Sequence, residues 1–127
     1  MIETAGLNHT FIEKCIRSFA ELLSIEVPNL LVYVDDTMKP TGECYQNSDD
    51  DYMIVLKAQE EGRMIHALAH EMVHVKQFLK DDLASHFCLD IPYMERWWEI
   101  EAYSKEKDLM KDLIEKVNSG VINKNIT

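Results

Sequence analysis

Residues 64–79 read MIHALAHEMVHVKQFL, and this stretch decides how the rest of the chain is interpreted. Apolar side chains recur in it at spacings of three and four, and neither proline nor glycine interrupts it after Gly62. This spacing predicts one helix from about Glu60 to Lys80, with an apolar stripe facing the core and a more polar side carrying histidines. The predicted stripe consists of Met64, Ile65, Leu68, Ala69, Met72, Val73, Phe78 and Leu79.

The pentapeptide His70-Glu71-Met72-Val73-His74 lies within this helix and has the pattern HExxH. Side chains four positions apart lie on one helical face with their Cβ atoms about 5–6 Å apart, so both imidazoles can reach one metal ion. Glu71 can then hold a metal-bound water and accept its proton. The pentapeptide therefore predicts a catalytic zinc site, which needs a third protein ligand and an open fourth position.

The best candidate for the third ligand lies downstream, where Trp97-Trp98-Glu99-Ile100-Glu101-Ala102-Tyr103 opens a second helical run that continues to about Val117. Glu99 and Ala102 place a carboxylate and a small side chain on neighbouring parts of one helical face, so this helix can approach its partner closely. Glu101 is the alternative ligand. It lies about 200° around the helix from Glu99, so only one of the two can face the ion.

In these residues the chain resembles the gluzincin metallopeptidases, in which a glutamate helix carrying Glu-x-x-Ala or Glu-x-x-Ser supplies the third zinc ligand. The resemblance covers roughly residues 30 to 117 and is closest to small single-domain forms, such as minigluzincins and IrrE-type peptidase-like domains. It implies that Glu99 is the ligand, and that a helix, a short curved sheet, the HExxH helix and the glutamate helix follow in that order. The chain lacks the Asp after Ala102 that orients a ligating histidine in many relatives, so the group orienting His70 or His74 is left open.

Two more histidines compete for a role at this site. His86 lies twelve residues after His74, a distance at which SprT-like metallopeptidases also place a third ligand, although Phe87 replaces the glycine that usually follows. His66 extends the four-residue spacing backward, but the three helical histidines then span about 12 Å, too far for one ion. We therefore interpret His66 as a surface residue or as a partner of a metal ligand.

Three aromatic side chains belong to the second helical run. Tyr103, one turn after Glu99, is a candidate to donate its hydroxyl to a developing oxyanion, and half-buried packing is the alternative. Trp97 and Trp98 are expected to pack the start of this helix against the core.

The N-terminal half predicts a helix followed by strands. Asn8 or Thr10 can cap a first helix that ends at Pro28-Asn29. The expected strands are residues 30–34, 43–46 and 52–57, with a turn at residues 39–42. The segment just before an HExxH helix in zincins is commonly an edge strand against which an extended peptide pairs, so the resemblance implies that residues 52–57 form the rim of the cleft.

The chain of 127 residues is expected to form one domain, residues 1–117, with a polar C-terminal tail at residues 118–127. Residues 118–120, Asn-Ser-Gly, should stop the last helix, and residues 81–93 should form a loop or short helix that walls one side of the site. Some minigluzincins are held inactive by a chain terminus in the cleft, and this tail is a candidate for the same role.

The net charge and the cysteine content indicate which kinds of binding partner and which cellular compartment to expect. The net charge is −10, from 23 acidic and 13 basic side chains, which disfavours nucleic acid and weakens the SprT-like interpretation. Residues 49–51, three aspartates, lack the spacing of a calcium loop and are expected to form a solvated turn. Three separated cysteines suggest neither a disulfide framework nor a structural zinc site. With no signal-peptide pattern and no membrane-spanning run, the expected compartment is the cytoplasm.

The sequence thus predicts an α+β, zincin-like domain that binds one catalytic Zn²⁺ through His70, His74 and Glu99. The expected function is zinc-dependent hydrolysis of peptide bonds by a metal-bound water, with Glu71 as general base, in an active or latent endopeptidase. Its partner would be a peptide or protein substrate rather than a membrane, and a monomer is favoured over an oligomer. The alternative is a non-catalytic zinc-binding interaction or regulatory module of the same fold, against which the presence of Glu71 argues.

Overall fold

The computed structural model of the chain describes residues 1–86 and 91–124. Within these residues the elements, in chain order, are β1 (Ile2–Ala5), α1 (His9–Leu23), β2 (Asn29–Asp35), β3 (Gly42–Ser48), β4 (Asp51–Lys57), α2 (Glu61–Lys80), the short 3-10 helices η1 (Leu83–His86) and η2 (Tyr93–Glu95), and α3 (Trp97–Asn118). The predicted mixture of helices and strands in one α+β chain is confirmed.

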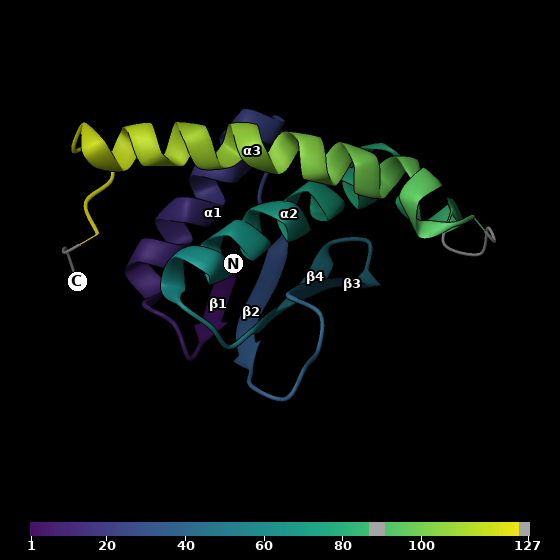
Figure 1. Cartoon of the computed structure of the whole chain (residues 1–127), viewed down its shortest axis with the longest axis horizontal. Coiled ribbons are helices and arrows are strands. Elements are labelled where there is room, and N and C mark those ends of the chain that lie inside the picture. The colour runs from purple at the N-terminus through teal and green to yellow at the C-terminus, as the bar shows by residue number, and fades with distance from the viewer. Residues whose placement is uncertain (87–90, 125–127) are drawn as a thin grey trace.

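The sheet is mixed and has the strand order β1-β2-β4-β3. β1 and β4 both run parallel to β2, whereas β3 runs antiparallel to β4. Figure 1 shows the helices gathered on one side of the sheet, where α1 and α2 contact the strands and α3 packs across α1 and α2. The two central strands, β2 and β4, bury alternate residues beneath the helices, and the core lies between these two layers.

The sheet differs from the prediction in two ways. Residues 52–57 were expected to form the edge strand at the cleft, but β4 pairs on both sides and β3 is the edge strand. The apolar run of β4 suits a strand enclosed by neighbours, and the more polar β3 suits an edge. β1 was not predicted at all, because its four residues carry little apolar pattern and its partner β2 lies beyond a whole helix in the sequence.

The helices agree more closely with the prediction. Asn8 caps α1 by accepting a hydrogen bond from the backbone N–H of Phe11 at 3.3 Å. α1 ends at Leu23, before the predicted Pro28, because Ser24 takes a left-handed backbone conformation with φ 58°. α2 and α3 match the expected ranges within one or two residues, and residues 118–120 end α3 as predicted. The predicted loop or short helix at residues 81–93 contains η1 and the start of η2, with residues 87–90 outside the described part.

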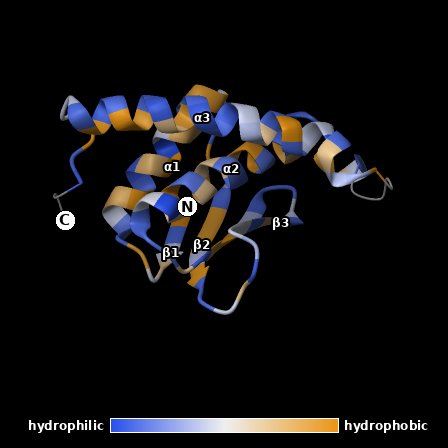
Figure 2. Cartoon of the chain, viewed as in Figure 1, coloured by the Kyte–Doolittle hydropathy of each residue, from blue (hydrophilic) through white to orange (hydrophobic). Residues whose placement is uncertain are grey.

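α2 is buried on more than the predicted stripe, because it lies between the sheet, α1 and α3. Its histidine-bearing side faces α3 and a cavity rather than open solvent. Val75 is fully buried although it was not in the stripe, whereas Leu79 at the stripe's end is 38% exposed. Figure 2 shows the corresponding mixture of hydrophobic and hydrophilic residues along the outer helix, α3.

The structure also shows two of the cysteines and the first residues of the C-terminal tail. Cys15 and Cys44 are free thiols, and Cys88 lies outside the described residues. In the tail, Ile122 is buried and Lys124 forms an ion pair with Glu61 at the start of α2.

In the described part of the chain, no helix has the length and apolar character needed to cross a bilayer.

The core position of Leu68 gives a test of this packing. Leu68 on α2 is fully buried, so Leu68→Ala is expected to lower the free energy of unfolding by about 2–5 kcal/mol through lost apolar contacts and a residual cavity. Leu79→Ala, on the same helix but exposed, should cost less than about 1 kcal/mol. Urea unfolding in the presence of a chelator measures both without a contribution from bound metal. Equal losses for the two variants would contradict the packing of α2.

Candidate metal centre

The three residues predicted to bind a metal lie together where α2 packs against α3. Glu99 Oε1 lies 3.0 Å from His70 Nε2 and 3.0 Å from His74 Nε2. One donor atom from each residue lies within 4.8 Å of the other two. Ligand atoms about 2.0–2.1 Å from a tetrahedral ion are separated by roughly 3.3 Å, so this trio could hold one metal ion.

His74 is oriented by Gln77, one turn further along α2. The Gln77 side-chain N–H₂ donates to the backbone oxygen of Trp98 at 2.9 Å and to Glu101 Oε1 at 2.9 Å. Its oxygen must therefore accept from His74 Nδ1, which lies 2.7 Å away. With its proton on Nδ1, the neutral imidazole directs the lone pair of Nε2 toward Glu99, as a metal ligand requires.

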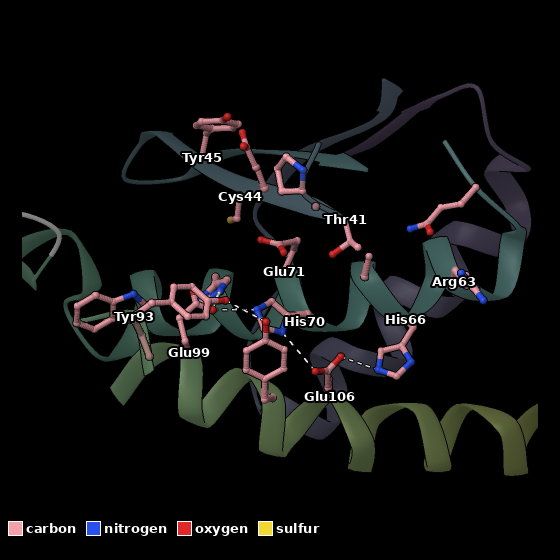
Figure 3. A pocket seen from close by; sticks show the side chains of 18 of the residues that line it. Thr41, Cys44, Tyr45, Arg63, His66, His70, Glu71, Tyr93, Glu99 and Glu106 are labelled. Carbon is pink, nitrogen blue, oxygen red and sulfur yellow. Dashed lines mark hydrogen bonds and ion pairs between the residues drawn. The ribbon is translucent and has the colours of Figure 1, made fainter. Parts of the chain in front are cut away.

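His70 is oriented by Glu106, which lies seven residues after Glu99 and so on the same face of α3. Glu106 Oε1 is 3.5 Å from His70 Nδ1, and its second oxygen is 2.6 Å from His66 Nε2 (Figure 3). Glu106 thus supplies the carboxylate that the sequence lacks immediately after Ala102. His66 is a half-exposed partner of this carboxylate, in line with its predicted role outside the metal ligands.

The alternative third ligands lie elsewhere. Glu101 points toward Lys76, whose ammonium is 3.3 Å from its carboxylate oxygens, and toward Gln77. His86 accepts a hydrogen bond from Trp97 Nε1 at 3.5 Å and packs edge-on against that indole ring. Neither joins the group of possible metal donors among the described residues. The structure therefore places Glu99, and not Glu101 or His86, with the two histidines.

Glu71 is the most buried carboxylate among the residues that line the site. It is 5% exposed, and burial raises its pKa to about 7 although the charges of His74 and His70 act to lower it. The backbone of β3 lies directly against it, since a Cβ atom on Gly42 would be 3.1 Å from Glu71 Cγ and 3.1 Å from Oε2. Gly42 was predicted only as the end of a turn, and nothing in its local sequence indicates this contact.

The three candidate ligand residues shift one another's pKa values. Burial acts to raise the pKa of Glu99, but hydrogen bonds from His70 and His74, together with their charges, hold it at about 2. Burial acts to lower the pKa of both histidines, and their hydrogen bonds to Glu99 and the nearby carboxylates raise it above the ordinary value. The carboxylate of Glu99 is therefore ionised at neutral pH and suited to a cation.

A cavity of about 940 Å³ surrounds these groups. Its walls come from β3 and the residues before it, from α2, and from η2 and α3, as Figure 3 shows. The described tail residues 121–124 do not line it, and Lys124 forms its ion pair with Glu61 at the start of α2. A role for the tail within the cavity therefore has no support from its described part, and residues 125–127 lie outside the description.

Aromatic side chains form one end of the cavity. Tyr103 is half exposed, and its ring packs against His70 with 4.6 Å between centroids. Its hydroxyl lies 3.0 Å from that of Tyr93, a residue that sequence reasoning did not single out, and burial raises the pKa of Tyr93. Trp98 is buried, as predicted for packing at the start of α3, and it also lines the cavity. Trp97 packs against Trp98 and His86.

Gln77 offers a test of the metal centre in which none of the three candidate ligands is replaced. Gln77→Leu is expected to weaken zinc binding about 10- to 100-fold, because His74 loses the acceptor that sets its tautomer and ring orientation. Gln46→Leu is the matched control, since Gln46 donates to Tyr52 and does not line the cavity. Competition with a chromogenic chelator measures both affinities. Unchanged affinity in Gln77→Leu would show that this hydrogen bond does not orient a ligand.

Comparisons of the chain with protein-family models, with curated proteins and with solved structures find no match.

Proposed function

We propose that the chain is a zinc-dependent metallopeptidase of gluzincin type, in which His70, His74 and Glu99 hold one Zn²⁺. The observation that carries the proposal is the position of Glu99 Oε1, 3.0 Å from Nε2 of each histidine. Two imidazole nitrogens and one carboxylate oxygen are the donor set of several catalytic zinc sites, which leave the fourth position open. When bound, zinc supplies a Lewis acid for the scissile carbonyl and lowers the pKa of a bound water toward about 7.

Glu71 is the proposed general base. It lies between His70 and His74 on α2, lines the cavity, and is too buried to serve as an ordinary surface carboxylate. A raised pKa suits a group that accepts a proton from water and then passes it to the leaving amine. A purely structural metal site has no need of such a carboxylate, so Glu71 favours hydrolysis over a non-catalytic binding module.

The two tyrosines at the cavity are proposed to assist at the carbonyl oxygen. The Tyr103 hydroxyl is held near the metal ligands by ring packing on His70 and by its contact with Tyr93. A phenol hydroxyl can donate a hydrogen bond to the oxyanion that develops during attack. Tyr103 retains the role suggested by the sequence, and Tyr93 is added as its partner.

The proposed substrate site is the free edge of β3. Residues 42–45 of this strand line the cavity opposite α2, and β3 pairs with β4 on its other side only. An extended peptide can add to such an edge through backbone hydrogen bonds, which places its carbonyl groups beside the metal ligands. An edge strand, an HExxH helix and a glutamate helix in this arrangement support a zincin-like fold.

The test is zinc content together with peptide cleavage. Purified protein, dialysed against metal-free buffer, is expected to retain about one zinc per chain and to cleave members of a random hexapeptide library, as followed by mass spectrometry. Activity should disappear after treatment with a chelator and return when zinc is added. Stoichiometric zinc with no cleavage would instead favour the non-catalytic module, and the absence of zinc would contradict the proposal.

Gly42 provides a sharper test of the position of Glu71. Gly42→Ala is expected to reduce hydrolysis roughly tenfold without loss of zinc, because the added Cβ must displace Glu71 by a few tenths of an ångström. The matched control is Gly62→Ala, since Gly62 also lines the cavity but its Cβ would meet nothing closer than Glu60 Oε1 at 3.8 Å. Steady-state kinetics and metal analysis measure both variants. Equal activity in the two would show that the contact with β3 does not position Glu71.

A further inference from the structure

Arg63 is the one lysine or arginine among the described residues that line the cavity. Its side chain is exposed, and within residues 1–86 and 91–124 it forms no hydrogen bond or ion pair. Two of the carboxylates that line the cavity already have cationic or hydrogen-bonding partners: Glu99 contacts both candidate ligand histidines, and Glu106 contacts His66 and His70. The guanidinium of Arg63 is therefore free to bind a ligand.

The cavity has chemically different ends. α2 and β3 run in the same direction along it, with Arg63 and Thr41 at one end and Tyr45 and Tyr93 at the other (Figure 3). Arg63 precedes His70 by seven residues, which corresponds to about 10 Å along a helix. One end of the cavity thus carries an exposed guanidinium and the other end aromatic side chains, with the candidate metal ligands between them.

The direction of β3 along the cavity predicts the direction in which a bound peptide would run. Antiparallel pairing is more frequent and slightly more stable than parallel pairing, so a peptide on the free edge of β3 is expected to run opposite to that strand. Its C-terminal part then lies toward Arg63. An extended chain rises about 3.3 Å per residue, so about 10 Å corresponds to three residues beyond the metal ligands.

We propose that Arg63 binds a carboxylate located two or three residues after the scissile bond, so that the enzyme prefers substrates carrying either a free C-terminus or an acidic side chain at this place. The inference rests on the proposed peptidase function and on the position of a free guanidinium at the C-terminal end of the peptide path. Guanidinium groups bind carboxylates through paired, charge-assisted hydrogen bonds, which makes arginine the suitable residue for this role. A neutral amide in the same place would lose these bonds.

The kinetic test uses one cleaved hexapeptide made in four forms. In two forms the third residue after the scissile bond is the last, with a free or an amidated C-terminus. In the other two forms the C-terminus is amidated and the third residue is Glu or Gln. We expect kcat/KM to be about tenfold higher for each carboxylate form than for its neutral partner. Arg63→Gln should remove both preferences, whereas Arg17→Gln, which changes an exposed arginine on α1 paired with Glu13, should retain them.

A binding test separates this inference from the proposed chemistry. Fluorescein-labelled hexapeptide pools with free or amidated C-termini are titrated with zinc-loaded Glu71→Gln protein, with and without Arg63→Gln, and followed by anisotropy. About tenfold tighter binding of the free-carboxylate pool that depends on Arg63 would support the inference even if the wild type cleaves nothing. Cleavage or binding without a carboxylate preference, or a preference that survives Arg63→Gln, would overturn it while leaving the peptidase proposal intact. The absence of binding by both pools would also overturn it.

Discussion

Glu71→Gln is expected to lower the rate of peptide hydrolysis by about 10²- to 10⁴-fold and to leave the zinc content unchanged. The amide has nearly the shape of the carboxylate, so it fits beside Gly42 without disturbing the packing of α2 against β3. It cannot accept the proton of an attacking water, however, and the catalytic step loses its base. Single-turnover cleavage of a fluorogenic peptide, with metal analysis of the same samples, measures both quantities.

The matched control for this variant is Glu43→Gln. Glu43 also lines the cavity, on β3, but it belongs to no group of possible metal ligands among the described residues. Its loss should change hydrolysis by less than about tenfold. Similar losses for Glu43→Gln and Glu71→Gln would point to a general effect of cavity charge and not to a base. Full activity in Glu71→Gln would remove Glu71 from the mechanism.

The second large effect is expected for Glu99→Ala, which should weaken zinc binding by more than about 100-fold. Substitution of residues that only contact a metal ligand weakens binding by up to about 100-fold, and loss of a ligand should cost more. The variant removes the only carboxylate that approaches both histidine Nε2 atoms within the described residues. Peptide hydrolysis should fall with the zinc content and should return in part at high zinc concentration. Isothermal titration of the metal-free protein with zinc measures the affinity.

Two further variants make this result specific to Glu99. His86→Ala removes a histidine that contacts Trp97 and Trp98, and Glu101→Ala removes a carboxylate that contacts Lys76 and Gln77. His86→Ala should leave zinc affinity unchanged, and Glu101→Ala should reduce it only modestly through Gln77. Loss of zinc in His86→Ala with retention in Glu99→Ala would reverse the ligand assignment and favour the SprT-like alternative.

The surroundings of the metal centre illustrate what a sequence pattern can and cannot indicate. Gln77 and Glu106 were not predicted as partners of His74 and His70, although both are buried polar residues on helical faces that also carry buried apolar side chains. Buried polar groups need hydrogen-bond partners, so their positions within these faces were an available signal. The identity of each partner was not available, because it depends on how α2 and α3 are aligned.

The sequence alone determined the two helices and the two histidines, and it favoured Glu99 over the alternatives Glu101 and His86 as the residue that meets them. A helix repeats every 3.6 residues, so His70, His74 and the spacing from Glu99 to Ala102 already specify which side chains share a face. Tertiary structure alone decided that β3 and not β4 forms the edge, that β1 joins the sheet, and that Gly42, Tyr93 and Arg63 border the same cavity. The physical reason is the sequence separation of the contacts. Helical spacing depends on neighbouring residues, whereas strand neighbours and cavity walls arise from packing between segments far apart in the chain.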